Sequence, residues 1–118
     1  MSLRMRFLFV CRANVDWGPT AEEVCRQIAR EKELHIEVSS AGISRRANRS
    51  LTKAIADQAD TIFVMEPDMA IEMAEGYGQD PGKILCLNIP DIYERDDPRL
   101  LAILEDDLYE YLEREGLI

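Results

Sequence analysis

The chain alternates short apolar runs with longer stretches in which apolar and polar residues repeat at helical spacing. Short apolar runs bounded by polar or turn-forming residues are typical of strands buried in a sheet. The longer stretches carry an apolar stripe on one face, as expected of helices that cover a sheet. The predicted strands are residues 4–10, 34–40, 61–65 and 83–88, and the predicted helices are residues 19–31, 50–57, 67–75 and 98–114.

Start signals support the helical segments. Pro19, Pro67 and Pro98 stand where three of them begin, and proline is favoured in a first turn because the backbone N–H there has no partner. Ser50 is a capping-type residue at the start of the remaining predicted helix, residues 50–57. One stripe of the last helix is expected to pack on the sheet; it comprises Leu101, Leu104, Leu108 and Leu112.

Strands that alternate with helices predict a parallel sheet with helices on both faces. Right-handed crossovers then favour a doubly wound α/β fold: a three-layer, flavodoxin-like domain with a four-stranded parallel sheet. The length suits a single domain over residues 1–118. Ligands of such folds bind at the carboxyl ends of the strands, so the candidate loops follow Val10, Met65 and Asn88.

The formal net charge of -9 argues against nucleic acid or an anionic membrane as a partner, because both require clustered cations. No targeting segment is recognisable, and three cysteines without CxxC spacing suit free thiols in a reducing compartment. We therefore expect a cytoplasmic protein. The cations lie mostly in the first half of the chain, where Arg45, Arg46 and Arg49 crowd together.

The turn after the first strand has the form of an anion site. Cys11 ends the strand, and Pro19 opens a helix whose unsatisfied N–H groups and dipole favour negative charge. The same groups would stabilise a thiolate, lower the pKa of Cys11 and make it nucleophilic. Asn14 is expected to hold the turn by side-chain hydrogen bonds to the backbone. The alternative is that Cys11 is a small buried residue at a strand end.

Four motifs occur in order along the chain. Val10, Cys11, Asn14, Pro19, Ala21 and Glu22 match the loop pattern V-C-x-x-N-x-x-R-S-P-x-A-E. SSAG follows at 39–42, ADTIFVMEP at 59–67 and IPDIY at 89–93. With these motifs the chain resembles the low-molecular-weight protein tyrosine phosphatases, in particular a short predicted bacterial and archaeal branch of that family.

The resemblance implies a phosphatase that forms a phosphocysteine intermediate and uses no metal or other cofactor. By motif match, Cys11 is the nucleophile, Asp91 is the general acid and Tyr93 lies on the substrate rim. The implied substrate is a phosphorylated protein or a small aryl phosphate, and the oligomeric state is left open. The phosphate-binding loop would comprise Arg12, Ala13, Asn14, Val15, Asp16, Trp17 and Gly18.

The loop departs from the family pattern where the chemistry takes place. Trp17 occupies the position of the phosphate-clamping arginine, and Gly18 that of the serine that hydrogen-bonds the thiolate. One neutral N–H replaces a bidentate charged fork, so impaired activity is expected. A neighbouring arginine such as Arg12 could attract a phosphate without clamping it, and Arg45, Arg46 and Arg49 are expected to form an ordinary solvated loop.

Two alternatives remain open. One is a catalytically inactive relative that binds an anion or a partner. The other, less favoured, is an arsenate reductase, which needs resolving cysteines within reach of Cys11. Several further residues are expected to be structural, namely Cys25 and Cys86 in the core, Met69 and Met73 in helix packing, His35 in a strand and Asp97 as a helix cap.

Overall fold

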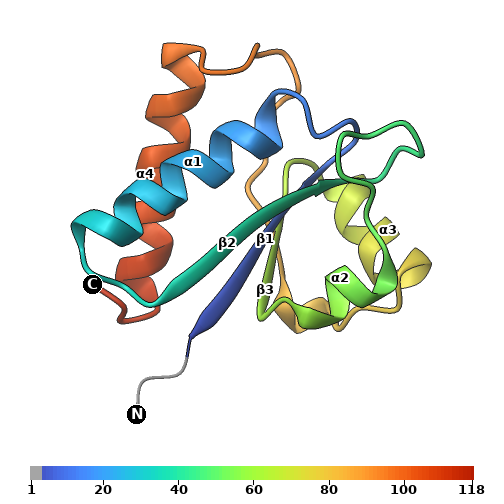
Figure 1. Ribbon diagram of the computed structural model, residues 1–118, viewed down its shortest axis with the longest axis horizontal. Helices are drawn as coiled ribbons and strands as arrows, with labels where there is room; N and C mark the ends of the chain where they lie inside the picture. Colours follow the sequence, from blue (N-terminus) through green and yellow to red (C-terminus); the bar gives the residue numbers. More distant parts are fainter. Residues whose placement is uncertain (1–3) are drawn as a thin grey trace.

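The computed structural model describes residues 4–118, and its centre is a sheet of four parallel strands (Figure 1). The strand order is β2-β1-β3-β4. Near the carboxyl end of β1, Val10 lies opposite Ala41 of β2 on one side and Val64 of β3 on the other. The predicted flavodoxin-like α/β fold is confirmed. The strands are β1 (Met5–Cys11), β2 (Ile36–Gly42), β3 (Thr61–Val64) and β4 (Ile84–Cys86).

Helices cover the sheet on both faces, as a doubly wound chain requires (Figure 1). One side carries α1 (Trp17–Glu31) and α4 (Pro98–Arg114), which pack on each other. The other side carries the short α2 (Lys53–Gln58) and α3 (Pro67–Gly76). The carboxyl ends of the strands therefore meet at one edge, with the turn between β1 and α1 at the centre.

The boundaries near this edge differ from the prediction. Cys11 is the last residue of β1 because it pairs with Gly42, so both strands end later than predicted. Helix α1 begins at Trp17, two residues before Pro19, since the indole is drawn into the core. Helix α2 begins later than expected, with the Thr52 hydroxyl and not Ser50 as its cap. Strand β4 is short because a 3-10 turn, η1 (Pro81–Lys83), precedes it.

An aromatic cluster forms the centre of the core between the sheet and α4. Phe63 stacks on Phe9 at 4.7 Å between ring centroids and meets Tyr111 edge-to-face at 5.1 Å. The leucine stripe of α4 is buried as predicted except at its first position, where Leu100 and not Leu101 faces the sheet. Met69 and Met73, both on α3, are fully buried, as expected of core residues.

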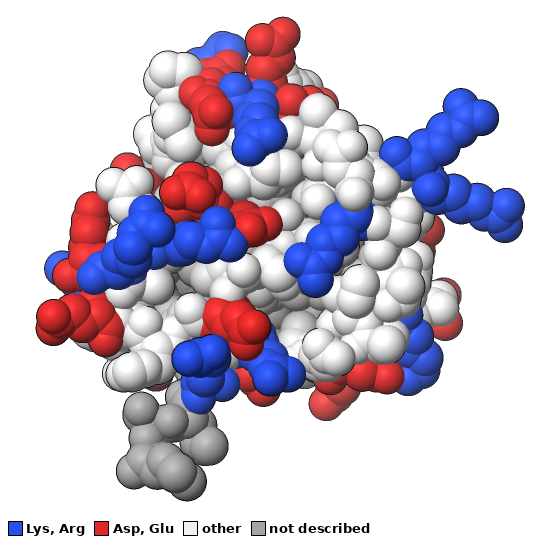
Figure 2. Space-filling model, in the orientation of Figure 1, with Lys and Arg blue, Asp and Glu red and all other residues white. Residues whose placement is uncertain are grey.

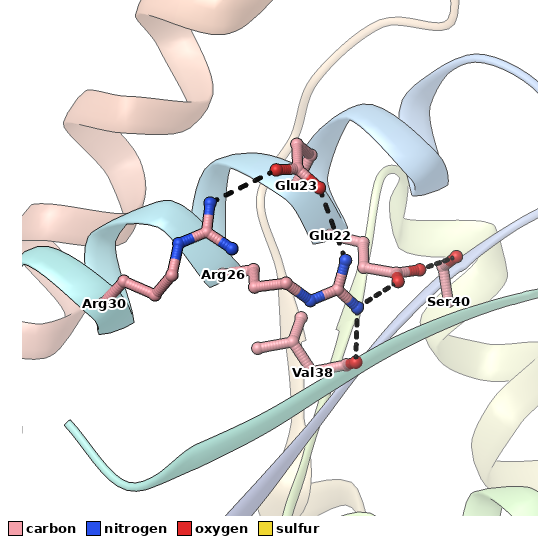
Figure 3. A network of polar contacts seen from close by, with 6 residues as sticks. All are labelled: Glu22, Glu23, Arg26, Arg30, Val38 and Ser40. Atoms are coloured by element: carbon pink, nitrogen blue, oxygen red, sulfur yellow. Dashed lines mark hydrogen bonds and ion pairs between the residues drawn. The ribbon is translucent and has the colours of Figure 1, made fainter. Parts of the chain in front are cut away.

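A polar network holds α1 against β2 (Figure 3). The Ser40 hydroxyl donates to Glu22 Oε1 at 2.5 Å, and the other oxygen of Glu22 is paired with the Arg26 guanidinium. Arg26 also donates to the Val38 carbonyl at 3.2 Å and to the exposed carboxylate of Glu23 at 3.3 Å. Because Ser40 lies two residues before the end of β2, the network fixes the helix near the edge where the strands terminate.

Within residues 4–118, every helix is too short or too polar to cross a membrane.

Replacing Glu22 by alanine should destabilise the fold, because it leaves the Ser40 hydroxyl and one side of Arg26 without an acceptor. We expect a loss of about 1–2 kcal/mol in the free energy of unfolding, measured by urea denaturation at 25 °C. Glu23→Ala is the matched control; it removes an exposed ion pair to the same arginine and should cost at most about 0.5 kcal/mol. Equal losses for both variants would contradict the role assigned to the network.

Candidate active site

The turn between β1 and α1, residues 11–18, is wound tightly around the sulfur of Cys11. Asn14 has a left-handed backbone, with φ at 56°, a conformation that asparagine tolerates better than most residues. The Asn14 N–H donates to Cys11 Sγ at 3.2 Å. The predicted role of the Asn14 side chain is wrong, since its Oδ1 is buried and has no hydrogen-bond partner. The turn is held by the backbone conformation instead.

Two opposing effects act on the Cys11 thiol, which is 4% exposed. Burial raises its pKa above the usual value, and the nearby charge of Asp91 acts in the same direction. Backbone N–H groups of Gly18, Asn14 and Val15 lower the pKa, as the sequence predicts, but burial outweighs them. The expected lowered pKa is therefore wrong, and Cys11 is mainly a neutral thiol near pH 7.

Trp17 is a core residue, although it stands at the position of the clamping arginine. Its side chain is 2% exposed and packs on Phe9, with ring centroids 5.8 Å apart and an interplanar angle of 63°. Trp17 is also among the residues that line the small cavity at the cysteine loop. Its Nε1 is buried without a hydrogen-bond partner, which is an uncommon state for a buried donor.

Arg12 turns away from a clamping role. Its guanidinium lies 3.0 Å from Asp68 and 3.8 Å from Glu72, both on α3. These exposed ion pairs direct the guanidinium towards α3, and the two carboxylates partly offset its charge. Although Arg12 borders the cavity as predicted, the structure gives it acidic partners, and sequence reasoning gave no sign of them.

Asp91 reaches the cysteine loop from the segment between β4 and α4, as the motif match implies. The cavity that they share has a volume of about 50 Å3. This exceeds by a few-fold the roughly 10–15 Å3 that a water molecule needs, so a small group fits there. Its lining consists of Cys11, Arg12, Ala13, Asn14, Val15, Asp16, Trp17 and Asp91.

The segment that carries Asp91 is fastened to the rest of the site at both ends. On one side, the buried Ile89 donates its N–H to the Met65 carbonyl at 3.0 Å. On the other, Asp16 Oδ1 accepts the N–H of Arg95 at 3.0 Å, and Thr20 Oγ1 accepts that of Asp96 at 3.2 Å. Sequence reasoning gave Asp16 only a loop role and missed Thr20. A polar side chain in the first turn of α1 was the signal available.

The remaining predicted residues of this segment lie outside the cavity. Tyr93 is half-buried under the guanidinium of Arg99, 5.4 Å above its ring, and does not line the cavity. Asp97 accepts the Arg99 N–H at 2.9 Å and caps α4, as expected.

Gly18, in the first turn of α1, is packed closely against the cysteine turn, because a Cβ there would come within 2.5 Å of Asn14 Oδ1 and 3.0 Å of Cys11 Sγ. A serine at this position would therefore displace Asn14.

The segment after β2 supports the other side of the cysteine loop. Gly42 allows this approach, because a Cβ there would lie 2.7 Å from the Arg12 carbonyl oxygen. Ile43 and Ser44 donate backbone N–H groups to the carbonyls of Cys11 and Arg12, at 2.9 and 2.8 Å. Asn48 binds the Ala13 and Asn14 carbonyls through its N–H and Nδ2, both at 3.2 Å. The SSAG motif thus marks a backbone contact with the loop.

The other cysteines and the histidine lie away from this chemistry. Cys25 is buried in α1, where burial raises its pKa to about 12. Cys86 is half-buried and not a full core residue, and its thiol contacts the Met65 carbonyl at 3.6 Å. His35 is exposed. Among residues 4–118 no group of three His, Cys, Asp or Glu side chains is placed to hold a metal ion.

A larger hollow of about 270 Å3 lies over another part of the sheet and includes none of the residues that line the cysteine cavity. Its lining is largely polar and includes Arg6, Glu37, Ser39 and Arg49. Arg6 and Glu37 are paired there at 3.2 Å. Ile55 and Gln58 of α2 also line the hollow, so it lies between that helix and the strands β1 and β2.

Comparison with known proteins gives the site its context. Residues 6–60 match the family described as low molecular weight phosphotyrosine protein phosphatase. No curated protein sequence matches the chain significantly. The structure, however, is similar to those of several solved phosphatases at sequence identities near 20%, which show a shared fold.

Three of these structures illustrate the likeness. The tyrosine phosphatase Wzb from Escherichia coli K30, in complex with phosphate, has a TM-score of 0.77 at 20% identity, covering 95% of this chain and 99% of that one. A low molecular weight protein tyrosine phosphatase from Bacillus subtilis has a TM-score of 0.75 at 21% identity, with the same coverage. The YwlE arginine phosphatase has a TM-score of 0.74 at 20% identity, covering 92% and 96%.

Replacing Asp91 by asparagine should lower the pKa of Cys11, because the negative charge that disfavours the thiolate is removed. The rate of alkylation of Cys11 by iodoacetamide, followed by peptide mass spectrometry between pH 6 and about 10, should then reach its midpoint at lower pH than in the parent. Glu94→Gln, a neutralisation in the same segment, is the control and should leave the midpoint unchanged. An unchanged midpoint in Asp91→Asn would mean that this carboxylate does not act on the thiol.

Proposed function

We propose that this chain, which belongs to the low molecular weight phosphotyrosine protein phosphatase family, binds phosphotyrosine or another aryl phosphate in its cysteine loop and hydrolyses it only slowly. The observation that carries the proposal is that Cys11 and Asp91 line the same small cavity. Trp17, which stands where the family motif has arginine, lines it as well. In this proposal Cys11 would act as the nucleophile and Asp91 as the acid, without a clamping cation at position 17.

The chemistry would proceed in two steps. The Cys11 thiolate attacks phosphorus and forms the S–P bond while the bond to the phenol oxygen breaks, and Asp91 gives that oxygen a proton. Water then attacks the phosphocysteine, with Asp91 taking one of its protons, so that inorganic phosphate leaves and the thiolate is restored. Backbone N–H groups of Asn14, Val15 and Gly18 would stabilise negative charge throughout.

The rate of these steps is expected to be low for two reasons. A transition-state arginine in related phosphoryl transfers contributes roughly 10³ to 10⁵ in rate, and Trp17 offers only one neutral N–H. The raised pKa of Cys11 also limits the thiolate fraction near neutral pH. Since Arg12 is held by Asp68 and Glu72, it does not replace the missing charge.

Binding is less affected than turnover. The first turn of α1 presents free N–H groups at the positive end of its dipole, and this arrangement suits an anion without further help. The buried Nε1 of Trp17 has no partner, and a phosphate oxygen in the cavity would supply one. Phosphotyrosine is the substrate class that the family description favours, and phosphoarginine, the class suggested by YwlE, is the alternative to include in assays.

A catalytically inactive relative that only binds an anion or a phosphorylated partner is the second candidate. The burial of Trp17 favours it, because an indole fixed in the core cannot move to follow a transition state. An arsenate reductase is not favoured, since Cys25 is buried with a pKa raised to about 12 and is a poor resolving thiol. The negative charge keeps nucleic acid and membranes outside the proposal, and a cytoplasmic location stays part of it.

Phosphate release from para-nitrophenyl phosphate between pH 5 and about 9 separates the two candidates. Because para-nitrophenolate is a good leaving group that does not need the proton of Asp91, we expect slow turnover that increases with pH as Cys11 ionises, and no turnover in Cys11→Ser. If the parent and the Cys11→Ser variant release phosphate at the same background rate, the chain is not a phosphatase, and the binding candidate takes its place. Turnover that survives the Cys11→Ser substitution would show that another group performs the reaction.

Replacing Trp17 by arginine should increase turnover per folded molecule by about 10³-fold or more, because it restores a bidentate charged donor at the loop. The same change removes a buried indole and should lower the free energy of unfolding by about 3–5 kcal/mol, so activity is normalised to the folded fraction. Trp17→Gln is the matched control, with a similar loss of packing but no charge. A gain in both variants, or in neither, would contradict the assignment of position 17.

A further inference from the structure

We propose that the loop after β2, residues 43–50, is a docking surface for an acidic protein segment that carries the phosphorylated residue. This inference rests on the proposed function and specifies its substrate as phosphotyrosine flanked by Asp and Glu. It is carried by three observations: the lack of acidic partners for the arginines of this loop, the attachment of the loop to the cysteine turn, and the distribution of charge over the chain.

The arginines of the loop lack the ion pairs that six of the eleven other Lys and Arg residues have. In residues 4–118, ion pairs engage Arg6, Arg12, Arg26, Arg30, Lys53 and Arg99. By contrast, Arg45, Arg46 and Arg49 are exposed and no carboxylate of the described chain lies within ion-pair distance of them. Figure 2 shows cationic side chains that extend from the side of the molecule where this loop lies in Figure 1.

The loop is attached to the cysteine turn by hydrogen bonds. Its backbone and the Asn48 side chain bind the carbonyls of four consecutive residues of the cysteine turn, 11–14. Internal bonds also shape it, since the Arg46 N–H donates to Ser44 Oγ at 3.2 Å and the Ser50 hydroxyl to the Arg45 carbonyl at 3.4 Å. The backbone that carries these arginines is therefore held against the turn that contains Cys11.

The charge distribution selects the partner. The chain has a formal net charge of -9, so a polyanion would be repelled by most of the molecule and attracted only near this loop. A short acidic segment beside a phosphotyrosine matches a patch of this size, whereas nucleic acid would need a more extended basic surface. Since the cavity lacks a free cation of its own, these rim charges would supply capture and orientation of the substrate.

The surface can be tested with fluorescein-labelled phosphotyrosine peptides whose flanking residues are either Asp and Glu or Ser and Gly. Binding to the Cys11→Ser protein is measured by fluorescence anisotropy at low and high salt. We expect the acidic peptide to bind about three- to tenfold more tightly at low ionic strength, and this preference to disappear at about 0.5 M salt. In Arg45→Glu/Arg46→Glu the preference should be lost or reversed, while the neutral phosphopeptide binds as before.

The matched control is Arg4→Glu/Arg114→Glu, which changes the net charge equally at exposed arginines outside this loop and should keep the preference. Equal binding of both phosphopeptides, or a preference that survives Arg45→Glu/Arg46→Glu, would overturn the docking surface and leave the proposed function intact. Binding of an unphosphorylated acidic peptide that depends on these arginines, with no gain from phosphate, would support the surface and overturn the proposed function. Tighter binding of a single-stranded oligonucleotide to the same arginines would overturn the partner class.

Discussion

The Trp17 indole packs on Phe9 in the core, and the cysteine turn closes around it. Helix α1 starts at this residue, two positions before its proline, and the Gly18 N–H in its first turn acts on the thiol of Cys11. The packing also places a buried, neutral side chain at the position that the family motif gives to a clamping arginine. Under the proposed function, the turn would therefore bind an anion while turnover stays low.

The charges around the site are those of a loop that has tryptophan where the family motif has arginine. With no cation at position 17, burial dominates the pKa of Cys11, and the carboxylate of Asp91 adds to the effect. Arg12 is committed to Asp68 and Glu72 on α3. In the described residues, exposed arginines without an ion pair stand outside the cavity lining, both on the loop after β2 and at Arg95 in the segment that carries Asp91. A site built in this way would select for charge around the phosphate more than for the phosphate itself.

Much of this arrangement could be predicted from the sequence, because it depends on local patterns. The alternation of strands and helices predicts the sheet, and the family resemblance, through the loop motif and IPDIY, assigns Cys11 and Asp91 to one site. Element ends were less predictable, since the end of β1 depends on its pairing with Gly42 and the start of α1 on the burial of Trp17. The pKa of Cys11 was predicted in the wrong direction, because a sequence reveals N–H donors but not the burial that outweighs them. The partners of Arg12 and the anchors of the Asp91 segment, Asp16 and Thr20, are contacts between distant residues that no local pattern reveals.

The most direct test of this account is the indole N–H resonance of Trp17, the one tryptophan in the chain, during a titration with inorganic phosphate. The account predicts a saturable shift of this resonance together with the backbone resonances of Asn14, Val15 and Gly18, because the anion enters the turn and accepts the unpaired indole N–H. If the resonances of the turn move and the indole stays unchanged, phosphate binds without Trp17. If neither moves, the turn is no longer an anion site, and the central claim is wrong.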